Sequence, residues 1–203
     1  MAMRNKKSIV VIGEGITEHY YFSRLRDARR SCAFNICPTL PKHSDIATML
    51  RLAEVKYSEG YDYIVIVIDL DHINETGRER EFNMYMSHKK ALEKQSKAFI
   101  FVETMPCTEF WFLLHFWTKI QTPTYASYSQ MSAELHKVWP AYDKSDKFFR
   151  SVDIFQHLMT HGNIDKALNF ARQLSNIREH DPSLAFSFTQ MFKMFDLLDK
   201  LEE

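Results

Sequence analysis

The chain has 203 residues, of which 45% are hydrophobic and 14% aromatic, so it is long enough to bury a substantial core. With only 5 glycines and 6 prolines, its composition excludes a disordered or a repetitive all-β protein. The 26 basic and 26 acidic residues cancel. No overall charge therefore draws the protein to nucleic acid or to an anionic membrane, although a local basic face would suffice for nucleic acid.

Cysteine usage and the amino-terminal sequence bear on where the protein works. Cys32, Cys37 and Cys107 have neither a CxxC spacing nor a histidine at zinc-like spacing, which indicates reduced thiols. The basic start precedes an apolar run only one strand long, so it does not resemble a signal peptide, and no segment is long enough to cross a membrane. We therefore expect a cytoplasmic protein without a membrane partner.

Strand-like and helix-like segments alternate over the first half of the chain. Short apolar runs predict buried strands at residues 8–12, 34–40, 62–68 and 98–103. Apolar side chains at helical spacing predict the helices between them, at residues 19–30, 45–59 and 81–96. Thr17 and Ser44 are the expected N-caps of the first two helices. The alternation is typical of an α/β fold, here a parallel sheet of about four strands with helices on both faces.

The pattern changes after residue 117. Residues 109–116 are almost wholly apolar after one leading acid, which predicts a helix buried nearly all round. No later segment has the pattern of a buried strand. Helical patterns recur instead, at residues 127–138, 145–160, 163–179 and 184–201. We expect an α/β core over residues 1–117 and a C-terminal helical segment over residues 118–203 that packs on it, in one continuous domain or two.

Acidic residues fall at the carboxyl ends of predicted strands. Glu14 follows the first strand, and Asp69 and Asp71 end the third, on the same side of an extended chain. If these strands are neighbours, as in a flavodoxin-like strand order, the carboxylates meet at the edge where open α/β sheets bind ligands. Glu109, just after the fourth strand, could reach the same edge. Such oxygen ligands suit Mg²⁺ or Mn²⁺, whose chemistry fits phosphoryl transfer.

Each of these residues also has a structural interpretation. Glu14, Asp69 and Asp71 could be a turn residue, a strand end and a helix cap, but their joint placement at strand ends favours a metal site. Lys144 and Lys147 belong to a three-residue spacing that continues to residue 150. They could contact phosphates from one helix face, although a solvated face is the ordinary explanation.

Three other features favour structural roles. The glycine-containing turn after the first strand lacks the third small residue of a dinucleotide-binding loop, because Glu18 stands there, so we reject that interpretation. His115 falls on a different helix face from Glu109, which indicates a core histidine. His72 fits a solvated loop better than a catalytic role.

Three longer signatures surround the acids. They read Glu14-Gly15-x-Thr17-Glu18-x-x-Tyr21-Phe22, Asp69-x-Asp71, and Pro106-Cys107-x-Glu109-x-Trp111-x-Leu113-Leu114-His115-Phe116. Together they resemble the RloB-like family, whose core belongs to the Toprim fold class, and the resemblance extends from residue 9 to about residue 198. Leu70 departs from the family, which often has a charged residue between the two aspartates. Tyr142-Asp143-Lys144 corresponds to a Tyr-x-Lys found later in the family.

The resemblance implies phosphodiester chemistry. Toprim domains occur in topoisomerases, primases and nucleases, where a glutamate and an Asp-x-Asp pair bind Mg²⁺; the matching residues here are Glu14, Asp69 and Asp71. The family's Pro-Cys-x-Glu segment places Glu109 beside them. Family members are encoded next to restriction and abortive-infection systems, often beside an AAA-type or ABC-type ATPase. That context implies an anti-phage defence nuclease that acts on nucleic acid, DNA or RNA, with an ATPase partner.

Our leading hypothesis is therefore a Mg²⁺- or Mn²⁺-dependent nuclease. Glu14, Asp69 and Asp71 would hold the metal, Glu109 would ligate it or position the water, and Lys144 and Lys147 would contact phosphate. Two alternatives stay open, together with the oligomeric state. A haloacid-dehalogenase-like phosphatase also has an Asp-x-Asp after a hydrophobic strand, but usually its first strand. A non-catalytic regulatory subunit that binds the ATPase would have no use for the acids.

Overall fold

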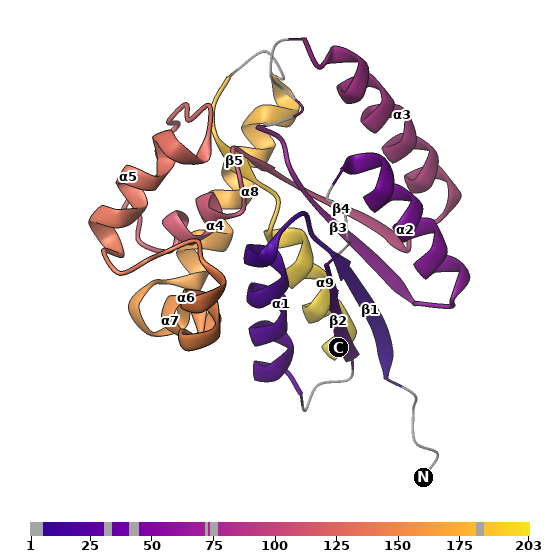
Figure 1. Ribbon diagram of the computed structural model, residues 1–203, viewed down its shortest axis with the longest axis horizontal. Coiled ribbons are helices and arrows are strands. Elements are labelled where there is room, and N and C mark those ends of the chain that lie inside the picture. The colour runs from indigo at the N-terminus through magenta and orange to yellow at the C-terminus, as the bar shows by residue number, and fades with distance from the viewer. Residues whose placement is uncertain (1–5, 31–33, 41–44, 72, 74–76, 182–184) are drawn as a thin grey trace.

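The computed structural model describes residues 6–30, 34–40, 45–71, 73, 77–181 and 185–203. Its centre is one sheet whose strands are β1 (Lys7–Ile12), β2 (Phe34–Thr39), β3 (Tyr63–Asp69), β4 (Phe99–Met105) and β5 (Phe188–Thr189). The strand order is β2-β1-β3-β4-β5 (Figure 1). The first four strands are parallel, and β5 is antiparallel to β4. The parallel α/β sheet and the adjacency of β1 and β3 are confirmed.

Helices cover both faces of this sheet. In the first half of the chain they are α1 (Ile16–Ala28), α2 (Ile46–Ser58) and α3 (Glu79–Gln95). Figure 1 shows α2 and α3 on one face and α1 and the C-terminal helix α9 (Phe192–Glu202) on the other. The β-branched strands between them are almost completely buried. This double coverage explains why their sequences are continuously apolar rather than alternating.

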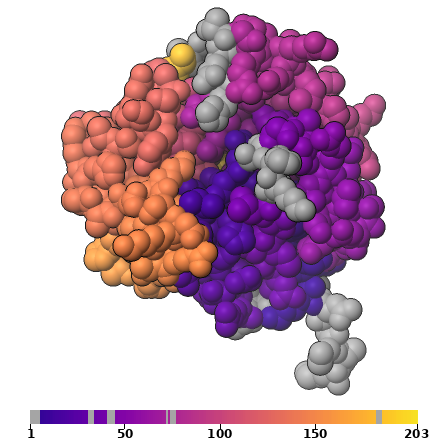
Figure 2. All heavy atoms as spheres, in the orientation of Figure 1, coloured from indigo at the N-terminus to yellow at the C-terminus, as the bar shows by residue number. Residues whose placement is uncertain are grey.

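The remaining helices gather beside α1. They are α4 (Glu109–Leu114), α5 (Tyr128–Val138), α6 (Asp146–Ser151), α7 (Ile154–His161) and α8 (Ile164–His180). Helices α6 and α7 pack on α1, while α5 and α8 pack on α4. In Figure 2 the orange atoms of α6 and α7 lie against the indigo atoms of α1. Side chains from both sides of residue 117 join one hydrophobic core. The division into two units at that residue stays a prediction.

Helix α4 is the apolar centre of this arrangement. Its residues 110–114 are all buried, and Trp111 donates its indole N–H to the hydroxyl of Tyr21 on α1 at 2.9 Å. His115, directly after the helix, is 2% exposed, and its Nδ1 lies 2.9 Å from the Trp111 carbonyl oxygen. Burial lowers the pKa of His115 to about 4. The prediction that His115 is a core residue is confirmed.

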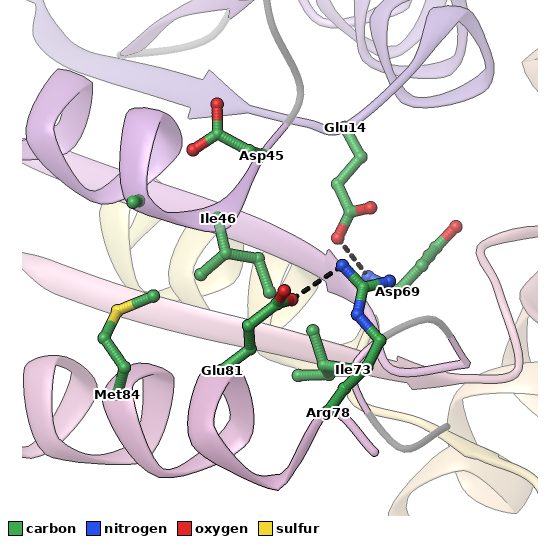
Figure 3. A pocket seen from close by; sticks show the side chains of 9 residues that line it. Glu14, Asp45, Ile46, Asp69, Ile73, Arg78, Glu81 and Met84 are labelled. Atoms are coloured by element: carbon green, nitrogen blue, oxygen red, sulfur yellow. Dashed lines mark hydrogen bonds and ion pairs between the residues drawn. The ribbon is translucent and has the colours of Figure 1, made fainter. Parts of the chain in front are cut away.

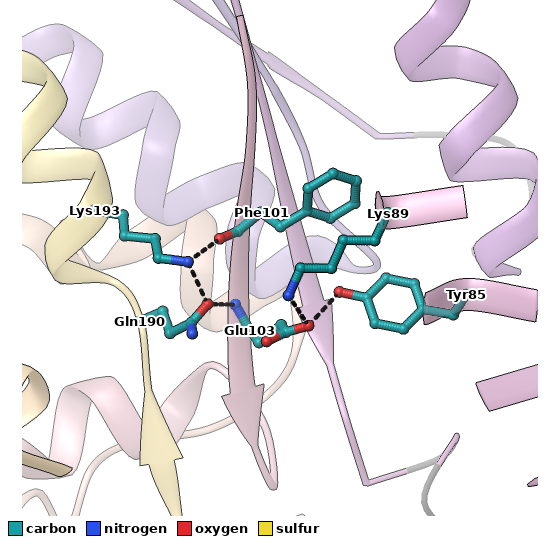
Figure 4. Close-up of polar contacts among 6 residues, drawn as sticks. All are labelled: Tyr85, Lys89, Phe101, Glu103, Gln190 and Lys193. Carbon is teal, nitrogen blue, oxygen red and sulfur yellow. Dashed lines mark hydrogen bonds and ion pairs between the residues drawn. The ribbon is translucent and has the colours of Figure 1, made fainter. Parts of the chain in front are cut away.

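A polar network joins β4 to the elements on either side of it (Figure 4). The Glu103 carboxylate accepts hydrogen bonds from the Tyr85 hydroxyl and the Lys89 ammonium, each at 2.7 Å. The backbone N–H of Glu103 donates to the side-chain oxygen of Gln190 at 3.3 Å, and Lys193 donates to the same oxygen at 2.8 Å. The network ties α3 and the segment between β5 and α9 to the edge of the sheet.

Several boundaries differ from the sequence-based expectation. The expected helix at 184–201 begins only at Phe192, because Phe188 and Thr189 pair with the end of β4 as a strand two residues long. The expected helix at 145–160 is divided into α6 and α7. Asp153 begins the second helix by accepting a hydrogen bond from the Gln156 N–H at 2.9 Å. The prediction that no strand follows residue 117 was wrong, since a strand this short has no readable alternation.

The expected N-caps differ as well. Thr17 lies inside α1, whose N-cap is Gly15. Ser44 falls outside the described residues, and Asp45 caps α2 by accepting a hydrogen bond from the Thr48 N–H at 2.9 Å. Within the described ranges no helix is both long and apolar enough to span a membrane.

We predict that Gly162→Ala destabilises the protein. A Cβ atom at residue 162 would lie 2.6 Å from the Cβ of His115 and 2.8 Å from the Leu158 carbonyl oxygen. The backbone cannot retreat freely, because the N–H of Asn163 donates to the His115 carbonyl oxygen at 2.8 Å. Overpacking of this kind costs about 1–3 kcal/mol. Urea denaturation should show this loss, while Ser129→Ala on an exposed helix position should change stability little.

Candidate active site

The carboxyl ends of β1, β3 and β4 bring acidic residues to one edge of the sheet. Glu14 follows β1, Asp69 ends β3, and Asp71 lies two residues further on. Because β1 and β3 are neighbours, the Glu14 Oε1 accepts a hydrogen bond from the Asp69 backbone N–H at 2.9 Å. All three acids line one cavity of about 250 Å³, together with Gly15, Thr17, Glu18, Cys107, Tyr128 and Lys144. The three acids therefore reach one edge of the sheet as the sequence predicted, and their role in holding a metal stays a prediction.

The turn between β1 and α1 folds a further carboxylate into the cavity. Glu18 is 3% exposed, and its Oε2 accepts a hydrogen bond from the Gly15 N–H at 2.8 Å. This contact places the Glu18 side chain against Gly13, where an added Cβ would lie 2.4 Å from the Cβ of Glu18. Glycine at residue 13 therefore leaves the space that the Glu18 side chain occupies.

Hydroxyl groups from the neighbouring strand and the following helix hold Asp69. Its Oδ1 accepts hydrogen bonds from Thr104 Oγ1 at 2.7 Å and from Thr108 Oγ1 at 3.3 Å. Thr104 is the β4 partner of Asp69 in the parallel register. The Asp71 backbone N–H donates to the Pro106 carbonyl oxygen at 3.3 Å, so the segment before α4 also fixes the chain after β3.

Glu109 lies behind the cavity. Its side chain is completely buried, and its Oε1 accepts hydrogen bonds from Thr17 Oγ1 at 2.9 Å and from the Tyr142 hydroxyl at 3.0 Å. The Lys144 ammonium forms an ion pair with the same oxygen at 2.9 Å. Within the described part of the chain, Glu109 Oε2 has no hydrogen-bond partner. The Lys144 side chain is 38% exposed and its Nζ lies 4.7 Å from the centre of the Tyr128 ring, so it reaches from Glu109 into the cavity.

The carboxylates repel one another in a water-poor place. Burial, together with the charges of Glu18 and Asp71, raises the pKa of Glu14 to about 8, although the Asp69 N–H opposes this rise. Burial and the charges of Glu18 and Glu14 raise the pKa of Asp69 well above its usual range. For Glu109, burial disfavours the charged form, but the Lys144 ammonium outweighs it and the pKa is lowered. The site therefore holds more buried acid than its cation compensates.

This excess of acid fits a divalent cation in its chemistry. Carboxylate oxygens are the ligands that Mg²⁺ and Mn²⁺ prefer, and Glu14, Asp69 and Asp71 line the same cavity. In the described ranges, no three histidine, cysteine, aspartate or glutamate side chains converge as a metal-binding group. Mg²⁺ does not require such a cage, since it usually keeps several waters and takes only one or two carboxylates plus substrate phosphate.

The two lysines suggested by the sequence lie in different places relative to the cavity. Lys144 lines the cavity, whereas Lys147 is exposed on α6 and is not among the described residues that line it. The expectation that both lie on one helix face with Arg150 was wrong. Lys144 precedes α6, and Arg150 forms an ion pair with Asp146. His72 lies outside the described residues.

Glu18 and Tyr128 are among the cavity-lining residues to which the sequence analysis gave no site role. Glu18 had a readable signal, since an acid three residues after an N-cap often folds back to it as a capping box. Tyr128 had none, because it begins a helix far along the chain and reaches the cavity only through the packing of α5 on α4.

Comparison with models of known protein families identifies a family for this chain. A family model described as RloB-like protein matches residues 9–198, almost the whole chain. No curated protein and no solved structure matches significantly.

We predict that Lys144→Met destabilises the protein in a pH-dependent way. Removing the ammonium leaves Glu109 buried without its counter-charge, and the partial exposure of Lys144 limits the cost to about 1–3 kcal/mol at pH 7. In the wild type the lowered pKa of Glu109 contributes stability that is present above the unfolded-state pKa and is lost as the pH falls. In the variant, burial without the ammonium raises the pKa of Glu109, so the difference between the two proteins should shrink as the pH falls from 7 and this carboxyl takes up a proton.

Urea denaturation across this pH range measures the effect, and Lys147→Met is the matched control on the neighbouring exposed lysine. An equal loss of stability in both variants, or a difference that does not depend on pH, would contradict the role given to the Lys144–Glu109 pair.

Proposed function

The chain belongs to the RloB-like family, and we propose that it is a metal-dependent nuclease that hydrolyses phosphodiester bonds in nucleic acid. One observation carries the proposal: Glu14, Asp69 and Asp71, from two neighbouring strands, line a single cavity at the carboxyl edge of a parallel sheet. Among the described residues lining that cavity, Lys144 is the only cation. Excess carboxylate beside one basic group suits an ion that in turn binds phosphate.

In this proposal Glu14, Asp69 and Asp71 hold Mg²⁺ or Mn²⁺. When bound, such an ion lowers the pKa of a water molecule and neutralises charge on the phosphate. Asp69 is oriented by the hydroxyls of Thr104 and Thr108, so it presents a fixed carboxylate at the end of β3. Preorganised groups of this kind lose little freedom when the substrate binds.

Lys144 supplies the phosphate contact. Its ammonium is anchored to Glu109 at 2.9 Å yet remains partly exposed, so it can approach a phosphate oxygen without leaving its counter-charge. The buried position of Glu109 supports an indirect role, in which it positions Lys144. Two roles stay predictions: Glu109 as a metal ligand or as the residue that positions the water, and Lys147 as a phosphate contact.

The biological setting is also part of the proposal. The family resemblance supports an anti-phage defence role with an ATPase partner, in the cytoplasm. The regulatory-subunit alternative keeps one observation in its favour, namely that no metal-binding group is already assembled in the described ranges. Metal binding by the isolated chain separates the two.

We predict that Mn²⁺ or Mg²⁺ raises the melting temperature of the wild type. An ion that binds only the folded state at 100 times its dissociation constant adds about 2.7 kcal/mol, or several degrees for a chain of this size. Asp69→Ala/Asp71→Ala should lose this response. Without metal, the melting temperature of the double variant should be at least as high as that of the wild type. The reason is that the substitutions relieve the mutual repulsion of the buried acids. Asp165→Ala, which removes an exposed acid on α8, should respond as the wild type does.

A metal response that persists in the double variant would place the ion elsewhere. No response in any protein would favour the regulatory subunit.

We predict metal-dependent cleavage of nucleic acid. Incubation with single-stranded and duplex DNA and RNA should show strand cleavage that EDTA abolishes. Asp69→Ala/Asp71→Ala should reduce the rate at least about 1,000-fold, and Lys144→Met about 10- to 100-fold, on the scale of one lost transition-state contact. Lys166→Met, at an exposed position of α8, serves as the charge-matched control. Undiminished cleavage by the double variant would overturn the assignment of these acids.

A further inference from the structure

A second cavity adjoins the acidic site. It has a volume of about 420 Å³, and Glu14 and Asp69 line it as well as the first cavity (Figure 3). Its other described lining residues come from the starts of α2 and α3 and the chain before α3: Asp45, Ile46, Ala47, Ile73, Arg78, Glu81 and Met84. The two acids therefore form a wall between two hollows, one containing Lys144 and the other Arg78.

Arg78 forms an exposed ion pair with Glu81 that a phosphate could replace. It stands at the N-cap of α3, its side chain is 38% exposed, and its Nη2 lies 2.6 Å from Glu81 Oε2 three residues along the helix. An exposed pair of this kind contributes less than about 1 kcal/mol, so a phosphate can displace it at little cost. Figure 3 shows the guanidinium projecting towards Glu14 and Asp69. A planar guanidinium is suited to bidentate phosphate binding.

The rest of the lining suits a flat, mostly apolar group. Ile46, Ile73 and Met84 provide apolar surface, and Ala47 leaves space between them. Asp45 and Glu81 add negative charge, which disfavours a second phosphate in the hollow but can accept hydrogen bonds from N–H groups. The volume falls within the range of small-molecule sites, about 300–1,000 Å³.

We propose that this second cavity receives an unstacked nucleobase next to the phosphate that is cleaved, and that Arg78 binds the adjoining phosphate. The inference rests on the proposed nuclease function and specifies its substrate. A base can enter such a hollow only when it is neither stacked nor paired, as in single strands, loops and flipped-out positions. The substrate is therefore single-stranded or locally unpaired nucleic acid.

Binding without cleavage tests the inference. The probe is a fluorescein-labelled single-stranded 12-mer, as DNA and as RNA, with Ca²⁺ in place of Mg²⁺, and the readout is fluorescence anisotropy. Arg78→Ala removes the phosphate contact, and Ala47→Trp fills the cavity from a partly exposed helix position. Each should weaken binding about tenfold or more, the effect of losing one charged hydrogen bond or one stacked base.

Matched controls lie on α3, the helix that Arg78 caps. Arg80→Ala removes an exposed arginine two residues away, and Ala91→Trp adds the same bulk at an exposed position of α3; neither residue is among the described residues lining the cavity. Both should bind within about twofold of the wild type. The duplex of the same sequence should bind at least about tenfold more weakly than the single strand. Arg78→Gln, which keeps most of the side chain, replaces Arg78→Ala if the latter unfolds.

The outcomes separate the inference from the proposed function. Wild-type-like binding by Ala47→Trp, or duplex binding as tight as single-strand binding, would overturn the inference while metal-dependent cleavage by the wild type still supported a nuclease. A wild type that neither binds nor cleaves any of these nucleic acids would overturn both.

Discussion

Buried carboxylates crowd one edge of the sheet, and the elements around that edge are arranged to hold them there. Burial and mutual repulsion push the pKa values of Glu14, Glu18 and Asp69 upward. Glu109 is the exception, since the Lys144 ammonium 2.9 Å away keeps it charged. Perturbation of several adjacent acids by burial and by one another is more typical of a functional site than of a structural one. A bound cation would relieve the repulsion that the folded chain otherwise bears.

The acids and their counter-charge come from different halves of the chain. The α/β core contributes Glu14, Asp69 and Asp71 from strand ends, where parallel pairing makes their positions follow from the register. The helical segment contributes Tyr128 and Lys144, which reach the cavity because the helices after residue 117 pack on α1 and α4. The site would be incomplete without either half. The two halves also share one hydrophobic core, which holds their contributions to the cavity in place.

The arrangement also orders the proposed chemistry in space. The wall formed by Glu14 and Asp69 separates a hollow that contains Lys144 from one that contains Arg78. A phosphodiester chain that crosses the wall would meet a cation on each side and carboxylates in the middle. Such alternation of charge suits a polyanion that must be held on both sides of the ion that activates water.

The sequence by itself determined the parallel α/β sheet, its first four strands, and the meeting of Glu14, Asp69 and Asp71. These follow from local rules, since apolar runs of strand length and alternating side chains place acids at one edge of a parallel sheet. Only the tertiary structure decided that β5 pairs with β4, that Glu109 is buried behind Lys144, and that Lys147 stays outside the site. It also decided that Arg78 lines a cavity together with Glu14 and Asp69. Each of these depends on contacts between segments far apart in the chain, and no periodicity along the sequence encodes which helix packs against which.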